Sequence, residues 1–207
     1  MIKQITFLTS ILFFTVQLLS QSKPAFDQGA ITKTLQRYVG DDTPGMAVGI
    51  VKDGQIIYEN YFGYANLEYK IKFNARTRSN IASTAKQFTA LMILQLSKEG
   101  KLKLEDDIRK YLPSLYPKVK EEIKIRHLIN HTSGIRDYVF IMEIMNKATW
   151  RQVGIGNNDV IELLEKQEEL TNTPGSEYSY SNSGYTILAK IIEKVAGTRF
   201  YDYSEQF

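Results

Sequence analysis

The sequence predicts an α+β domain in which a helical region packs on an antiparallel sheet. Two alternating segments flank Asp53-Gly54 and indicate one β-hairpin. Most of the later chain shows apolar residues at helical spacing. A two-stranded hairpin is not independently stable in water, and the sequence offers no clear partner strand after it. We therefore expect a sheet that is incomplete in this chain.

Glycine and proline delimit the elements in order. Pro44-Gly45 precedes the first strand, Gly100 ends the long middle helix, Pro113 ends a short one and Gly197 ends the last. Asn182 or Ser183 is expected to cap that last helix. The predicted strands are 46–52 and 55–62, and the predicted helices are 25–38, 83–99, 104–112, 123–130, 140–147, 159–166 and 182–197.

Length and composition fit one soluble globular domain. The chain has 207 residues, of which 43% are hydrophobic and 24% charged. It has no cysteine, which excludes disulfides, thiolate metal sites and a cysteine nucleophile. The net charge of +3 is small, and no Lys/Arg cluster interleaves with aromatic residues, so a nucleic-acid partner is not expected.

The N-terminus has the pattern of a secretory leader. Lys3 precedes the uncharged stretch 5–19, and small or polar residues follow at 20–22. The stretch is shorter than the about 20 apolar residues that span a membrane. We expect a signal peptide at 1–20, export to the periplasm or the medium, and no membrane insertion after cleavage, with an uncleaved anchor as the alternative.

The strongest chemical signal is Ser83 and Lys86 at the start of the middle helix. Residues three apart share a helix face, so the amine can reach the hydroxyl. Serine needs such a base, and lysine serves as one if burial or nearby positive charge lowers its pKa. The alternative is structural: Ser83 is a helix cap, Lys86 is solvated, and Thr84 and Gln87 form a capping box. Residues 20–23 repeat the Ser-x-x-Lys spacing, but at the end of the expected leader.

A second signal is Tyr180 with Asn182, in a loop before the last helix. A phenol beside a lysine can relay protons, and an amide can orient a substrate carbonyl or the lysine. The same Tyr-x-Asn spacing occurs at 58–60 and 64–66. Those copies lie in or beside the hairpin, where tyrosines usually pack across strands.

Four segments in this order resemble the serine beta-lactamase and penicillin-binding-protein superfamily. The likeness is strongest to its class C branch, with the related D-alanyl-D-alanine carboxypeptidases and esterases, and it runs from about residue 26 to the end of the chain. The segments are 44–48 with 52–54, 81–89, 127–135, and 174–197.

The resemblance implies a mechanism. Ser83 attacks an acyl carbon to form an acyl-enzyme, and its backbone N–H is one oxyanion donor. Lys86 accepts or relays the proton. Tyr180 is the partner base, and either activates water or protonates the leaving group. Asn182 binds substrate and holds the lysine. The resemblance implies no metal or other cofactor, a small-molecule or peptidoglycan-like substrate, and a monomer.

Two other chemistries find little support in the sequence. His127 and His131 are the only histidines, four apart on an expected helix, but a zinc site needs a third ligand and none is evident. The Gly-x-Ser-x-Gly pattern of another serine hydrolase class is absent. The resemblance instead makes His131 and Ser133 part of a structural turn beside the site.

The sequence departs from the family at one motif. Family members carry Lys-Thr-Gly or His-x-Gly on a late strand that supplies the second oxyanion donor, and neither follows the helical region here. We expect residues 21–207 to be the N-terminal portion of the domain, marginally folded and inactive or nearly so. Two hypotheses stay open: an exported serine hydrolase acting on a beta-lactam, a D-Ala-D-Ala peptide or a small ester, and a truncated non-catalytic fragment of one.

Overall fold

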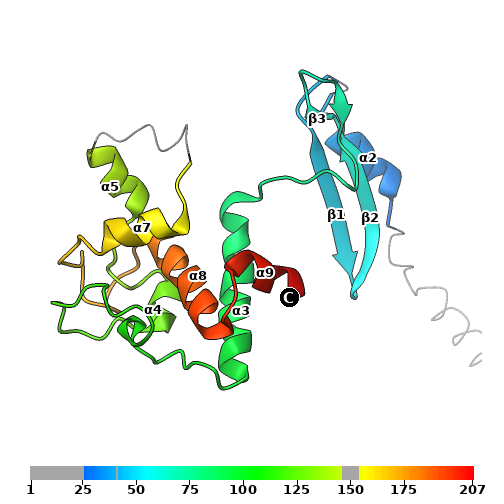
Figure 1. Ribbon diagram of the computed structural model, residues 1–207. Coiled ribbons are helices and arrows are strands. Elements are labelled where there is room, and N and C mark those ends of the chain that lie inside the picture. The colour runs from blue at the N-terminus through cyan, green and yellow to red at the C-terminus, as the bar shows by residue number, and fades with distance from the viewer. Residues whose placement is uncertain (1–25, 41, 146–153) are drawn as a thin grey trace, which may run out of the picture. The chain divides into compact units, whose positions relative to one another are not determined.

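The computed structural model describes residues 26–40, 42–145 and 154–207. The predicted leader at 1–20 and the end of the helix predicted at 140–147 lie outside these ranges. The chain forms two compact units, Met1–Asn80 and Ile81–Phe207 (Figure 1). In the described part of the chain, no helix combines the length and the apolar character needed to cross a membrane.

The first unit is a hairpin with a short helix and a second, smaller hairpin. The predicted strands are confirmed, with Met46 opposite Phe62 and Lys52 opposite Gln55. Asp53 and Gly54 both have positive φ, at 50° and 75°, as a tight hairpin turn requires. The elements are α2 (Gln28–Leu35), β1 (Met46–Lys52), β2 (Gln55–Phe62), β3 (Tyr64–Asn66) and β4 (Ile71–Lys72).

Tyr58 holds α2 against the hairpin. Its side chain is buried, its hydroxyl lies 2.9 Å from Thr32 Oγ1, and its ring meets Phe26 edge to face. Within the described residues, β1 pairs with β2 and β3 with β4 as two separate two-stranded sheets. The predicted α+β class is confirmed, and the 64–66 and 71–72 strands are additional to the prediction.

The second unit is helical, and α8 lies at its centre. Four residues on one face of this amphipathic helix, Ile187, Leu188, Ile191 and Ile192, are fully buried, and the helix contacts α3, α4, α7 and α9 (Figure 1). The elements are η1 (Ala82–Ala85), α3 (Lys86–Lys98), η2 (Ile108–Lys110), α4 (Ile125–Ile129), α5 (Tyr138–Ile144), α7 (Asn157–Leu164), α8 (Asn182–Ala196) and α9 (Phe200–Gln206).

The boundaries of α8 partly match the prediction. Gly197 ends the helix in the left-handed conformation, at φ 70°, which glycine adopts without a Cβ penalty. The predicted cap, Asn182 or Ser183, is wrong. Ser181 is the N-cap and accepts from the Gly184 N–H, because the side chains of the next two residues bind groups elsewhere.

The structural alternative for the middle helix is wrong in one respect. Thr84 and Gln87 do not form a capping box: α3 is entered through the 3-10 turn η1, and the Gln87 amide donates to the Thr84 carbonyl. The helix buries one face only. Its inner face carries Met92, Ile93 and Leu96, whereas the side chains of Phe88, Leu91 and Leu94 are exposed.

The prediction of a helix at 104–112 is wrong as well, because only the single turn η2 forms there. Asp107 caps that turn and also accepts from the Ile123 N–H. The Arg109 guanidinium donates to Asp107 and to the carbonyls of Val119 and Glu121. These long-range hydrogen bonds satisfy the polar groups of this loop, so the segment does not need the hydrogen bonds of a continuous helix.

Candidate active site

Ser83 and Lys86 lie at the junction of η1 and α3. Lys86 is the first residue of α3, and its Nζ donates to Ser83 Oγ at 3.1 Å. Ser83 is exposed and Lys86 is half-buried. Ala82, directly before the serine, has φ 48°, a left-handed conformation that favours glycine. The predicted serine–lysine contact is present at an exposed serine.

Tyr180 joins this pair from far along the chain. Its hydroxyl lies 2.7 Å from Ser83 Oγ, across a separation of 97 residues. The Lys86 ammonium lies 5.0 Å from the centre of the Tyr180 ring. Tyr180 precedes the cap of α8, so the position of this helix in the core determines where the phenol lies.

Asn182 contacts the lysine directly. Its Oδ1 accepts from Lys86 Nζ at 2.8 Å, and the Tyr180 hydroxyl is 3.5 Å from the same oxygen. Together with Ser83, these side chains form one hydrogen-bonded group in which the lysine touches both the serine and the amide. The sequence predicted all four residues, and the structure brings all four together.

Asp137 is the residue that the sequence reasoning missed. Its Oδ2 accepts from the backbone N–H of Asn182 at 2.6 Å and from its Nδ2 at 2.7 Å. Its Oδ1 accepts from the Val139 N–H, which caps α5. An aspartate just before a helix is typical of a cap, so no sequence pattern indicated the second contact.

His131 supports the tyrosine. Its ring stacks on the Tyr180 ring with centroids 4.4 Å apart, and its Nδ1 accepts from the Ser181 N–H at 3.1 Å. Burial lowers the pKa of His131, and the Lys86 charge lowers it further. The neutral imidazole is the form that can accept at Nδ1. The turn expected at His131 is therefore present. It binds the loop on both sides of Tyr180, because the His131 carbonyl accepts from the Ser179 N–H and the imidazole accepts from the Ser181 N–H.

The electrostatics of Tyr180 reflect opposing effects. Burial raises the pKa of its phenol, but the bonding and charge of Lys86 and the contact with Ser83 outweigh this, so the pKa lies below its usual value of 10.0. A nearby ammonium stabilises a phenolate. Tyr180 is thus better suited to accept a proton than an ordinary tyrosine.

The two histidines have structural partners. His127 lies in α4 and its Nδ1 accepts from the Lys124 N–H, whereas His131 lies beyond the end of that helix. The two rings therefore do not share a helix face as the spacing suggested. Among the described residues, no group of three His, Cys, Asp or Glu side chains is placed to bind a metal ion.

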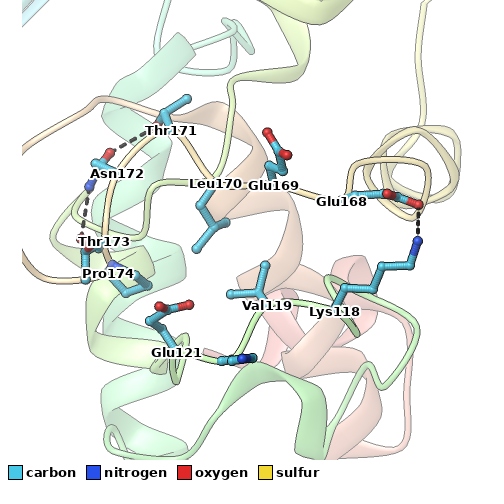
Figure 2. A pocket seen from close by; sticks show the side chains of 11 residues that line it. Lys118, Val119, Glu121, Glu168, Glu169, Leu170, Thr171, Asn172, Thr173 and Pro174 are labelled. Carbon is cyan, nitrogen blue, oxygen red and sulfur yellow. Dashed lines mark hydrogen bonds and ion pairs between the residues drawn. The ribbon is translucent and has the colours of Figure 1, made fainter.

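A separate open hollow of about 450 Å³ lies between the loops 118–121 and 168–174 (Figure 2). Lys118 forms an ion pair with Glu168 at one end, with the two atoms 2.6 Å apart. Its lining is mostly charged or polar and does not include Ser83, Lys86 or Tyr180. It is distinct from the serine–lysine group.

The sequence profile of the Beta-lactamase family matches residues 31–206. The chain belongs to this family. A curated penicillin-binding protein of Bacillus subtilis (strain 168) is 37% identical over 153 residues, which are 72% of this chain and 32% of that protein. The chain thus spans about a third of the length of the curated relatives it matches.

Solved structures of the family share the fold. The octameric penicillin-binding protein homologue from Pyrococcus abyssi is 31% identical with a TM-score of 0.70, covering 86% of this chain and 40% of that one. EstCE1, a hydrolase with promiscuous acyltransferase activity, is 26% identical with a TM-score of 0.69, covering 85% of this chain and 49% of that one. The fold is therefore beta-lactamase/transpeptidase-like, within a serine hydrolase superfamily.

Proposed function

We propose that this chain carries the acyl-transfer site of an exported serine hydrolase that cleaves amide or ester bonds through an acyl-enzyme on Ser83. One observation carries the proposal. The hydroxyl of Ser83 lies within hydrogen-bond reach of both a lysine amine and a tyrosine phenol, at 3.1 and 2.7 Å. A serine in such contact with two groups able to take its proton is an activated nucleophile.

The chemistry follows from these contacts. Ser83 Oγ forms a bond to the carbonyl carbon while its proton passes to the Tyr180 phenolate, or to Lys86 in its neutral amine form. The tetrahedral intermediate collapses as the C–N or C–O bond breaks, and the same proton goes to the departing amine or alcohol. Water then adds to the acyl carbon and gives a proton to the Tyr180 phenolate. The bond from that carbon to Ser83 Oγ breaks, the acid leaves, and Tyr180 returns the proton to Ser83 Oγ.

Two further groups complete the site in this proposal. The Ser83 backbone N–H donates to the developing oxyanion, and one such donor contributes about 3 kcal/mol of transition-state stabilisation. Asn182 binds the substrate and keeps Lys86 beside the serine. No metal or other cofactor takes part.

The substrate is a beta-lactam, a D-Ala-D-Ala peptide or a small ester. Family membership supports this range, and residues 21–207 act on it after a leader at 1–20 has directed export. The alternative that this chain is a non-catalytic fragment is supported by one observation: the chain covers 32% of the Bacillus subtilis relative.

Covalent labelling tests the proposal. The chain is treated with a fluorescent penicillin and, separately, with a fluorophosphonate probe, and the labelled residue is located by peptide mass analysis. A cooperative urea transition shows that the protein is folded. We expect labelling at Ser83 that Ser83→Ala abolishes. If the folded protein reacts with neither probe, the catalytic proposal is wrong and the fragment hypothesis holds.

A further inference from the structure

Asn182 has an amide whose two ends are nearly equal in shape but opposite in hydrogen bonding. Its Oδ1 meets the Lys86 ammonium at 2.8 Å, and its Nδ2 meets Asp137 Oδ2 at 2.7 Å. A flipped amide would put NH₂ against the ammonium and oxygen against the carboxylate. Both contacts would then be repulsive, so Asp137 and the Lys86 ammonium favour the same orientation of the amide.

The position of Asp137 is itself fixed from both sides. The fully buried hydroxyl of Ser183, one residue along α8 from Asn182, donates to the Arg136 carbonyl at 2.7 Å and accepts from the Tyr138 N–H at 2.8 Å. These are the two neighbours of Asp137 in the chain. The carboxylate is thus held against the start of α8 by bonds that do not involve it.

The same carboxylate joins two helices. Oδ2 accepts from the backbone N–H and the side-chain Nδ2 of Asn182, while Oδ1 caps α5 through the Val139 N–H at 2.8 Å. The two oxygens therefore have separate tasks. One faces the serine–lysine group through Asn182, and the other stabilises a helix end.

We propose that Asp137 is a positioning residue for the Ser83–Lys86 pair, because it fixes the orientation in which the Asn182 amide accepts from Lys86. It makes no hydrogen bond to Ser83 and reaches the Ser83–Lys86 pair through its two hydrogen bonds to Asn182. The catalytic consequence of this inference rests on the function proposed above. Its geometric content, that the Asn182–Lys86 bond depends on Asp137, does not require catalysis.

Two substitutions separate the tasks of the carboxylate. Asp137→Ser keeps a hydroxyl that can cap α5 but is too short to hold Asn182 as well. Asp137→Asn can turn its amide oxygen toward the two Asn182 donors and its NH₂ toward the Val139 N–H, so that only the cap on α5 is lost. The opposite orientation would place NH₂ against both Asn182 donors and is less favourable. Asp27→Ser is the matched control, since Asp27 caps α2 through the Ala30 N–H.

The first readout is the rate of Ser83 labelling by a fluorophosphonate. We expect Asp137→Ser to slow it about 10- to 100-fold, the loss typical of residues that orient metal ligands. Asp137→Asn should keep most of the rate, and Asp27→Ser all of it. Adding Asp137→Ser to Asn182→Ala should cause no further loss. A normal rate in Asp137→Ser, or a loss in Asp137→Asn alone, would overturn the proposal in favour of simple capping.

The second readout needs no catalysis. Urea unfolding of Asn182→Ala, Lys86→Met and the double variant gives the coupling free energy between these side chains. We expect a favourable coupling in the native background and none in the Asp137→Ser background. Coupling that survives in Asp137→Ser would refute the positioning role even if the chain proves unreactive, whereas loss of coupling in an unreactive chain would support it and reject only the proposed function.

Discussion

Tyr180→Phe tests the assembly of the site most directly. The substitution removes one oxygen, which lies 2.7 Å from Ser83 Oγ, and leaves the ring stacked on His131. If that oxygen shuttles the proton, the rate of Ser83 acylation should fall about 10²- to 10⁴-fold. This corresponds to about 3–5 kcal/mol of activation free energy.

The same change should hardly affect folding. Tyr180 is 42% exposed, and one lost hydrogen bond at such a site lowers the free energy of unfolding by about 1 kcal/mol or less. The large kinetic effect and the small effect on stability together distinguish a chemical role from a packing role. Urea denaturation of the native chain and the variant measures the second quantity.

The assay is the rate of fluorophosphonate labelling over a series of probe concentrations and pH values. Because the pKa of Tyr180 lies below its usual value, we expect the native rate to rise with pH before about pH 10 and this rise to vanish in Tyr180→Phe. Tyr178→Phe is the matched control. Its ring meets His131 edge to face from the same loop, and it should react normally. Native-like labelling of Tyr180→Phe would refute the reasoning.

Three further predictions concern stability. Arg109→Ala should lower the free energy of unfolding by about 2–3 kcal/mol, because it removes the guanidinium from the Asp107 carboxylate and from two backbone carbonyls. The exposed Arg199→Ala should have little effect in the same denaturation assay. Ile192→Ala should cost about 2–5 kcal/mol by urea denaturation, because the side chain is fully buried in α8. Burial lowers the pKa of both His127 and His131, so the unfolded chain binds more protons than the folded chain in acid. The free energy of unfolding should therefore fall as the pH drops below about 6.5. Urea midpoints measured from about pH 7.5 to about pH 5 test this, and a flat profile would contradict it.

The local elements could be predicted from the sequence because their determinants are local. The Asp53-Gly54 turn sets the pairing of Lys52 with Gln55 beside it, and Gly197 ends α8. The Ser83–Lys86 contact follows from helix geometry, since residues one turn apart share a face. Tyr180 and Asn182 were identified from a family pattern, which carries long-range information that spacing lacks.

Other features depended on contacts between distant segments. The 104–112 segment has a fair helical pattern, yet Arg109 and Asp107 bind the chain at 119–123 instead. Asp137 looks like an ordinary helix cap, and only the packing of α8 shows that its second oxygen binds Asn182. Side chains such as these have several possible partners of similar local energy, so the tertiary arrangement decides among them.

The sequence by itself therefore determined the serine–lysine pair, the first hairpin and the amphipathic face of α8. The family resemblance pointed to Tyr180, but only the tertiary structure brought its phenol to the serine across 97 residues and a carboxylate to the amide beside the lysine. The physical reason is range: backbone geometry constrains neighbours within one turn or one pair of strands, whereas groups far apart in the chain meet only when the buried face of α8 packs against the other helices.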